Sequence, residues 1–355
     1  MKIFKNIFIS AFLICCLVPS ILLTAGYKNP NRENRPLSKM PELIKDGGLN
    51  TGFAEGFDKY VSEHFALREG LINAFNTVDS ALLKDYNGQN AVIGKANHIF
   101  YAETVDDYLG IDLLTDEELE SAANYLLFVQ TMLKERGVLF AFMTAPNKAT
   151  VYPEYMPDYL IPTDAEGNME RLTALLTEKG VNVIDAKRVL LDGKMNRSVY
   201  YEHDSHWNNY GAMLVYNTIA ESFGLEKYDA ETYTVEYDRT GDLHYFVYPT
   251  TEYYEERIIY PEFHAYTSKR PIDFDRDKEI NTESGVNTLS MLVYHDSFGR
   301  SLQPLLSQSV GSLMMNAYFP YDLKTIEDNE PKIVLIELVE RNLDKLAQHA
   351  ISLGY

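Results

Sequence analysis

The sequence predicts an α/β fold in which a mainly parallel sheet is covered by helices on both faces. Two observations lead to this prediction. Short, continuous apolar runs, typical of strands that are buried on both sides, alternate with longer segments whose apolar residues recur every three or four positions. Glycines follow several of the helical segments, where helices commonly end. We therefore expect parallel strands that are joined by helical crossovers.

The chain begins with a basic segment and then an apolar one. Two lysines precede an uncharged apolar run over residues 7–23, so residues 1–27 are predicted to be a signal peptide or a membrane anchor. Either would place the remainder outside the cytoplasm, secreted or anchored to the outer face of the cytoplasmic membrane. Both cysteines, Cys15 and Cys16, lie in this run, so residues 28–355 contain no thiol and form no disulfide.

Composition divides the exported part into two regions. Residues 28–90 are predicted to form a linker rich in proline and glycine and then an N-terminal helical region, with a helix over 56–86. Residues 91–355 are predicted to form the α/β domain. Within it, residues 228–266 interrupt the alternation with tyrosines, prolines and acidic residues. We interpret them as an irregular insertion with room for short strands.

The α/β domain is predicted to begin with a β-hairpin and a capped helix. Residues 92–101 form two short apolar strands with a turn near residues 96–97. Thr115 and Glu118 have the spacing of a capping box, and Gly137 is placed to end the helix that follows. The helix is thus expected to precede the first strand of the sheet.

The remaining elements follow from the same two patterns. The predicted strands are 138–145, 181–184, 289–293 and 332–338, and the predicted helices are 168–179, 208–223 and 301–307. In an open parallel sheet, ligands bind outside the carboxyl ends of the strands. Three segments are therefore expected to meet at that edge, namely residues 145–148, 201–207 and 294–299.

These three segments contain a candidate catalytic triad. Asp204 and His206 are two residues apart, which places both side chains on one face of an extended segment. A carboxylate beside an imidazole orients the ring and stabilises its protonated form. Ser297 follows a predicted strand and precedes a helical segment, where backbone N–H groups can stabilise an oxyanion. Asn147 and Lys148 follow a neighbouring strand and could add further donors.

Two other interpretations fit the same residues. Asp204 and Ser297 could be helix N-caps, with His206 a hydrogen-bonded core residue. Alternatively, His203 and His295 could join Asp204 and His206 as metal ligands. The exported part has no cysteine ligand and no paired-histidine helix, so we expect neither a metal nor any other cofactor.

Three charged residues follow or end the last predicted strand. Contact with substrate is one interpretation of Glu337, Glu340 and Arg341, but we favour a solvated ion pair. The chain as a whole is strongly acidic, because 52 acidic residues outnumber 32 basic ones. Such a surface repels phosphate backbones, which argues against nucleic-acid binding.

Several motifs together resemble the DHHW family, which is related to the periplasmic alginate O-acetyltransferases and has an SGNH-hydrolase-like fold. The central motifs are Asp204-Ser205-His206-Trp207, followed by Gly211, and Asp296-Ser297-Phe298. The other matching pieces are Glu33-Asn34-Arg35 with Pro41, Phe65 with Arg68, Ile93-Gly94-Lys95, Ala145-Pro146-Asn147-Lys148 with Tyr152-Pro153, Gly241-Asp242-Leu243, and Glu337 with Glu340-Arg341-Asn342. The resemblance covers residues 31–345.

The resemblance implies catalytic roles. Ser297 would be the nucleophile, His206 the general base and Asp204 the carboxylate that orients it. The candidates for oxyanion or substrate contacts are Asn147, Lys148, Phe298 and Arg341. Two positions depart from the family pattern: Ser205 replaces a histidine and is expected to face away from Asp204 and His206, and His295 stands where glycine is common.

The resemblance also implies an activity, which is acyl transfer outside the membrane. The protein would move acetyl groups onto a cell-surface polysaccharide or exopolysaccharide through an acetyl-serine intermediate. A membrane-bound O-acyltransferase would deliver the acetyl groups. A carbohydrate acetylesterase with the same triad and a non-catalytic polysaccharide-assembly protein are the alternatives. Transferase and esterase differ in whether a sugar hydroxyl or water reaches the acyl-enzyme.

Overall fold

The computed structural model divides the chain into two compact units, which are residues 1–87 with 242–253 and residues 88–241 with 254–355. The structure describes residues 9–10, 12–14, 17–19, 21–22, 25–27, 37–45, 47–68, 70–71, 90–229, 232–274 and 276–355. Cys15, Cys16 and the motif Glu33-Asn34-Arg35 lie outside the described residues, as do parts of the apolar run. Within the described residues, no helix has the length and apolar character needed to span a membrane.

In the first unit, the elements whose bounds the structure gives are β1 (Ile44–Lys45), β2 (Gly48–Leu49), α2 (Phe53–His64) and α10 (His244–Val247). The prediction of a single helix over 56–86 was wrong, because α2 ends at His64 and Phe65 adopts an extended backbone with a ψ of 122°. Residue 69 and residues 72–86 of that predicted helix lie outside the described residues.

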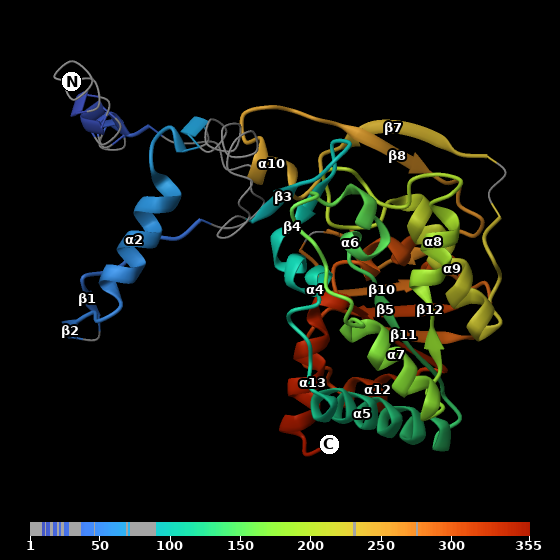
Figure 1. The fold of residues 1–355 in the computed structure, drawn as a ribbon. Coiled ribbons are helices and arrows are strands. Elements are labelled where there is room, and N and C mark those ends of the chain that lie inside the picture. The colour runs from blue at the N-terminus through green and yellow to red at the C-terminus, as the bar shows by residue number, and fades with distance from the viewer. Residues whose placement is uncertain are drawn as a thin grey trace. The chain divides into compact units, whose positions relative to one another are not determined.

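The second unit is built on a seven-stranded sheet with the order β6-β5-β13-β11-β12-β10-β9 (Figure 1). Its strands are β5 (Leu139–Ala145), β6 (Val183–Ile184), β9 (Thr267–Ser268), β10 (Glu279–Glu283), β11 (Ser290–Tyr294), β12 (Ser312–Asn316) and β13 (Ile333–Val339). The five strands from β6 to β12 are parallel, whereas β10 and β9 pair antiparallel at the edge. The predicted mainly parallel sheet is confirmed.

Helices cover both faces of this sheet. They are α4 (Val105–Leu109), α5 (Asp116–Glu135), α6 (Lys148–Val151), α7 (Asn168–Glu178), α8 (Ala186–Gly193), α9 (Asn209–Phe223), α11 (Gln303–Ser309), α12 (Lys324–Asn329) and α13 (Leu343–Ser352). The short 3₁₀ turns are η1 (Ala102–Thr104), η2 (Pro153–Tyr155), η3 (Gly299–Leu302) and η4 (Glu340–Asn342). Helix α8 packs on β5, and α9 on β6, from the face opposite to α5.

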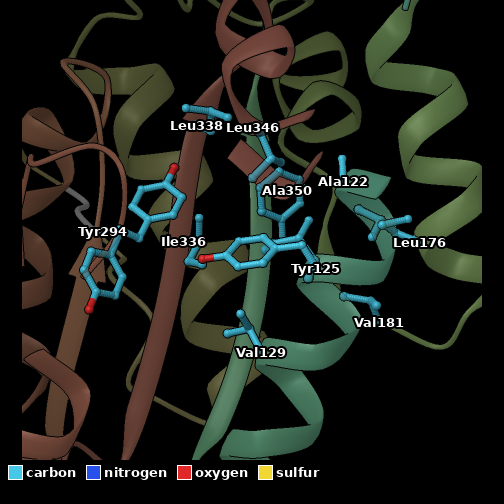
Figure 2. Packing of buried hydrophobic residues seen from close by; sticks show 14 of the residues in the cluster. Ala122, Tyr125, Val129, Leu176, Val181, Tyr294, Ile336, Leu338, Leu346 and Ala350 are labelled. Carbon is cyan, nitrogen blue, oxygen red and sulfur yellow. The ribbon is translucent and has the colours of Figure 1, made fainter. Parts of the chain in front are cut away.

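The main core lies between the sheet and the helices α5, α7 and α13. Figure 2 shows Tyr125 and Val129 of α5 beside Ile336 of β13. Leu346 of α13 and Leu176 of α7 belong to the same cluster of buried side chains. Because β13 is buried at every position, its sequence is apolar rather than alternating, with Glu337 as the one exception.

Local signals in the sequence set several helix ends. The capping box is confirmed: Thr115 Oγ1 accepts from the Glu118 N–H at 3.2 Å, and the Glu118 carboxylate accepts from the Thr115 N–H at 2.8 Å. Gly137 follows α5 with a φ of +68°, a region that costs glycine little. The predicted hairpin is also confirmed, as β3 (Ala91–Ile93) and β4 (Ile99–Tyr101).

The segment 228–266 contains a second hairpin. Its strands, β7 (Thr234–Arg239) and β8 (Glu255–Ile259), pair antiparallel with a shift in register beside Arg239. Arg239 and Glu255 are partners across the two strands at this irregular end. The hairpin lies in the second unit, whereas residues 242–253 belong to the first.

Candidate active site

The carboxyl ends of β5, β13 and β11 lie side by side, because these strands are neighbours in the sheet. The segment 200–207 reaches this edge between α8 and α9. Its ends are held by an antiparallel bridge between Tyr200 and Trp207, and the Tyr200 hydroxyl donates to Pro146 O at 2.6 Å. Lys148 Nζ also donates to Glu202 O at 2.6 Å, and His206 Nε2 lies 2.8 Å from Ser297 Oγ, so the predicted meeting of the three segments is confirmed by direct contacts.

Asp204, His206 and Ser297 form one continuous line of hydrogen bonds. His206 Nδ1 lies 2.7 Å from Asp204 Oδ1, and His206 Nε2 lies 2.8 Å from Ser297 Oγ. The Asp204 side chain is fully buried, that of His206 is 20% exposed, and Ser297 is exposed. A buried acid, a half-buried base and an accessible hydroxyl are arranged as nucleophilic catalysis requires.

A turn, rather than an extended strand, brings Asp204 and His206 together. Residues 202–206 bend, and the backbone N–H of His206 donates to Asp204 Oδ1 at 3.0 Å. The expectation that Ser205 faces away was consequently wrong, because its Oγ lies 3.3 Å from His206 Nδ1. Ser205 is thus a neighbour of the triad.

The helix-cap interpretation of these residues was also wrong. The N-cap of α9 is Asn208, whose side chain accepts from the Gly211 N–H at 3.0 Å. The residue that precedes η3 is Phe298, and the Ser297 hydroxyl contacts His206 instead of a helix end. Neither Asp204 nor Ser297 is therefore explained as a cap.

Asp204 contacts a second partner that the sequence did not indicate. Arg239 donates to Asp204 Oδ2 from Nε at 3.1 Å and from Nη2 at 2.5 Å. Burial alone would raise the pKa of Asp204, but the neighbouring His206, the hydrogen bonds that it donates and the Arg239 charge hold that pKa well below its usual range. This carboxylate is therefore ionised at neutral pH.

The turn that carries Ser297 is closed by a second carboxylate. Asp296 Oδ1 accepts from the Phe298 N–H at 2.9 Å, and Oδ2 accepts from the Val339 N–H at 2.6 Å. At the same turn, a Cβ on Gly299 would lie 2.5 Å from His295 Cβ. The turn thus accommodates His295 because position 299 carries no side chain.

The prediction of a solvated ion pair after the last strand was wrong. Glu337 lies within β13 and has no exposed surface, and Glu340 is buried as well. Glu340 accepts from the Asn147 N–H at 2.7 Å and from the Thr150 hydroxyl at 2.6 Å. Burial raises the pKa of Glu340 to about 7. Both buried carboxyl groups thus accept hydrogen bonds from the segments of the site, Glu340 from residues 147 and 150 and Glu337 from the N–H of Asp296.

Asn147 and Lys148 lie close to the site but are already engaged. The Asn147 amide donates to Asp107 Oδ2 at 3.0 Å. The Lys148 ammonium donates to three backbone carbonyls, those of Ile99 at 2.8 Å, Glu202 at 2.6 Å and Asp204 at 3.2 Å. We infer that both residues hold the framework of the site, whereas the sequence had suggested oxyanion donors.

Phe298 and Arg341 form the wall next to the triad. The Phe298 ring is 4.7 Å from the His206 ring and 5.0 Å from the Trp207 ring, measured between centroids. The Arg341 guanidinium lies 5.5 Å from the centre of the Phe298 ring and 5.4 Å from that of Tyr101. Among the described residues, it donates no hydrogen bond, so its N–H groups are available to a ligand.

Comparisons with known proteins agree with this fold. Residues 91–269 match the family model described as an SGNH hydrolase-like domain of the acetyltransferase AlgX, a region that includes Asp204, His206 and Arg239 and ends before Ser297. Among solved structures, a DHHW family protein from Eubacterium siraeum has a TM-score of 0.51 at 17% identity. The alignment covers 73% of this chain and 98% of that one.

Two curated proteins are similar in sequence. A probable alginate O-acetylase AlgJ from Pseudomonas aeruginosa is 26% identical over 187 residues, which is 50% of this chain and 43% of the relative. A probable alginate O-acetylase AlgJ from Azotobacter vinelandii is 22% identical over 221 residues, or 60% of this chain and 55% of that protein. The chain thus spans about half the length of these relatives.

The family match covers half of the chain, and the observed sheet is mainly parallel, as predicted. The resemblance found in the sequence motifs is thereby confirmed. This chain belongs to the family of SGNH hydrolase-like domains represented by the acetyltransferase AlgX.

Proposed function

We propose that this protein is an extracytoplasmic O-acetyltransferase that moves acetyl groups onto a polysaccharide through Ser297, His206 and Asp204. The main support is the unbroken line of hydrogen bonds from Asp204 through His206 to the exposed Ser297 hydroxyl. Family membership and the similarity to two probable alginate O-acetylases support acetyl transfer to a polysaccharide. In this proposal, residues 7–23 direct or anchor the protein to the outer face of the membrane.

The first half of the reaction acetylates the enzyme. Ser297 Oγ attacks the carbonyl carbon of the acetyl donor while His206 Nε2 takes the hydroxyl proton. Asp204 keeps the proton of the ring on Nδ1, so that Nε2 is free to accept, and it stabilises the imidazolium that forms. The tetrahedral intermediate then expels the leaving group, which takes the proton from His206. The product is acetyl-Ser297.

An oxyanion forms during this step and needs donors. The backbone N–H of Ser297 has no acceptor among the described residues, whereas that of Phe298 is bound to Asp296. We therefore assign stabilisation of the oxyanion to the Ser297 N–H and to the Arg341 guanidinium. Preformed donors of this kind act strongly because they need no reorganisation when charge develops.

The second half transfers the acetyl group. His206 Nε2 removes the proton from a sugar hydroxyl, whose oxygen attacks the carbonyl carbon of acetyl-Ser297. Collapse of the intermediate returns the proton to Ser297 Oγ and releases the O-acetylated sugar. Attack by water at the same point would make the protein an acetylesterase. We propose that a membrane-bound O-acyltransferase delivers the acetyl donor that Ser297 attacks.

The test uses the full chain with p-nitrophenyl acetate, alone and with alginate or other oligosaccharides as acceptors. We expect acetyl-Ser297 by mass spectrometry, acetylated sugar as product, and loss of both in Ser297→Ala. Ser222→Ala is the matched control, because Ser222 is an exposed serine near the far end of α9.

Each alternative has its own outcome. Acetate release that no acceptor diverts would support an esterase. Absence of acetyl-Ser297 in the wild-type protein, together with retained binding of oligosaccharide, would support the non-catalytic assembly protein. Unchanged turnover in Ser297→Ala would show that Ser297 is not the nucleophile.

A further inference from the structure

The irregular end of the β7–β8 hairpin contacts the segment that bears Asp204. Arg239 of β7 donates two hydrogen bonds to Asp204 Oδ2, at 3.1 Å and 2.5 Å. Glu255 of β8, the partner of Arg239 across the hairpin, accepts hydrogen bonds from the backbone N–H groups of Glu202 and His203, the latter at 2.8 Å. The hairpin thus binds this segment through a cation on one strand and a carboxyl group on the other.

The chain beyond β7 lies against the same segment. A Cβ at Gly241 would be 2.0 Å from His203 O and 2.7 Å from the Asp204 N. Backbone atoms cannot yield as a flexible side chain can, so this approach requires glycine. Three residues of the hairpin region therefore contact residues 202–204 directly.

Lys148 holds the carbonyl groups of the same segment. Lys148 donates to the carbonyls of Glu202 and Asp204, whereas Glu255 accepts from the N–H groups of Glu202 and His203. Donors and acceptors of these peptides are therefore satisfied by two side chains that are far away in sequence. Without such partners, the segment would no longer be held in one conformation, because unpaired buried polar groups are energetically costly.

We propose that Arg239 and Glu255 are positioning residues, which hold Asp204 and through it His206 in the geometry that the Ser297 hydroxyl needs. This inference rests on the proposed acyl transfer. The insertion between residues 228 and 266 then forms part of the support of the active site. Arg239 acts on the acid of the triad and Glu255 on the peptides before it, and neither contacts the reacting atoms.

Two features of Arg239 suit this task. Its planar guanidinium offers two donors in a fixed geometry, which sets the direction of the Asp204 carboxylate as well as compensating its charge. The guanidinium also lies 5.5 Å from the centre of the Tyr201 ring, which restricts its own movement. A lysine would keep the charge but lose the paired donors, and glutamine would lose the charge.

The test compares formation of acetyl-Ser297 in Arg239→Gln, Arg239→Lys and Arg239→Ala. We expect Arg239→Gln to lower kcat on the order of 100-fold, with KM for p-nitrophenyl acetate nearly unchanged, because misplacement of a catalytic group affects the chemical step. Arg239→Lys should regain part of this loss. Guanidinium at low millimolar concentration should restore Arg239→Ala but not Ser297→Ala.

Matched controls come from the same hairpin. Arg257→Gln removes an arginine of β8 that pairs with Glu236 and Asp238 and, among the described residues, donates no hydrogen bond to residues 202–204, so it should leave kcat unchanged. Glu256→Gln, which removes a partner of Arg197, is the control for Glu255→Gln. The double variant Arg239→Gln/Glu255→Gln should lose less than the product of the single losses, because both residues hold one segment.

A second readout does not depend on turnover. The Nδ1 proton of His206 should give a downfield NMR signal, identified by its absence in His206→Gln, that shifts or broadens in Arg239→Gln and stays in Arg257→Gln. Absence of acetyl-Ser297 in the wild-type protein would contradict the proposed function. The NMR signal of His206 would still test whether Arg239 positions Asp204 and His206. A wild-type kcat together with an unchanged NMR signal in Arg239→Gln would overturn the positioning role of Arg239. Failure of both Arg239→Lys and added guanidinium to restore activity in folded variants would overturn it as well.

Discussion

The backbone N–H of Asp296 donates a hydrogen bond to Glu337 Oε2 at 3.0 Å, so a fully buried carboxyl group lies against the turn that carries Ser297. Burial and the neighbouring Asp296 carboxylate raise the pKa of Glu337 well above its usual range. The raised pKa favours the protonated form of Glu337, whose Oε2 accepts from the turn that carries Ser297.

Glu337→Gln should be tolerated, because an amide keeps an acceptor and has nearly the shape of a protonated carboxyl. Glu337→Ala should lower the free energy of unfolding by roughly 2–4 kcal/mol, since it leaves a cavity and an unpaired buried N–H group. Urea denaturation of both variants measures the difference. Equal destabilisation by glutamine and alanine would contradict this prediction.

Glu340 should make stability depend on pH. Burial raises the pKa of Glu340 from 4.5 to about 7 in the folded protein. Because the folded pKa is the higher one, this contribution is fully present below pH 4.5 and is lost as pH rises through 7, a change of roughly 3 kcal/mol. Between pH 4.5 and 7, the free energy of unfolding should therefore fall more steeply in wild type than in Glu340→Gln. Parallel curves would contradict this prediction.

Arg341 should act in the chemical step while contributing little to stability. Arg341→Gln should lower the rate of Ser297 acetylation by about 100-fold, the usual effect of losing one oxyanion donor. Its midpoint of thermal unfolding should change little, because a partly exposed cation–π contact contributes only about 0.5–1 kcal/mol. Single-turnover mass spectrometry measures the rate. Arg136→Gln, which removes a surface pair with Glu327, is the control.

Gly299→Ala should distort the turn that carries Ser297. Its Cβ would lie 2.5 Å from His295 Cβ and 2.9 Å from Glu337 Oε2, and a Cβ cannot move away without the backbone. We expect a loss of roughly 1–3 kcal/mol in the free energy of unfolding together with reduced acetylation of Ser297. Gly167→Ala should be mild, because its nearest contact is the end of the flexible Glu170 side chain. A neutral Gly299→Ala would disprove the tight turn.

Much of the fold could be predicted because its signals are local. The capping box of Thr115 and Glu118 needs only neighbouring residues, and the apolar run of β13 follows from burial on both faces. The strands β10 and β12 were not predicted. Strand β10 alternates buried and exposed residues over only five positions, and neither strand stands out from its flanking segments. Such strands are stabilised by pairing with neighbouring strands of the sheet, as β12 pairs with β10 and β11.

The sequence by itself determined the parallel sheet, the edge at which the site lies, and the identities of Ser297, His206 and Asp204 as candidates. Only the tertiary structure decided that a turn joins Asp204 to His206, that Lys148 binds carbonyls, and that Arg239 pairs with Asp204. Helix caps and apolar periods depend on residues within a few positions of one another. The Arg239–Asp204 pair spans 35 positions and depends on how a hairpin folds back onto a buried loop, for which no local pattern exists.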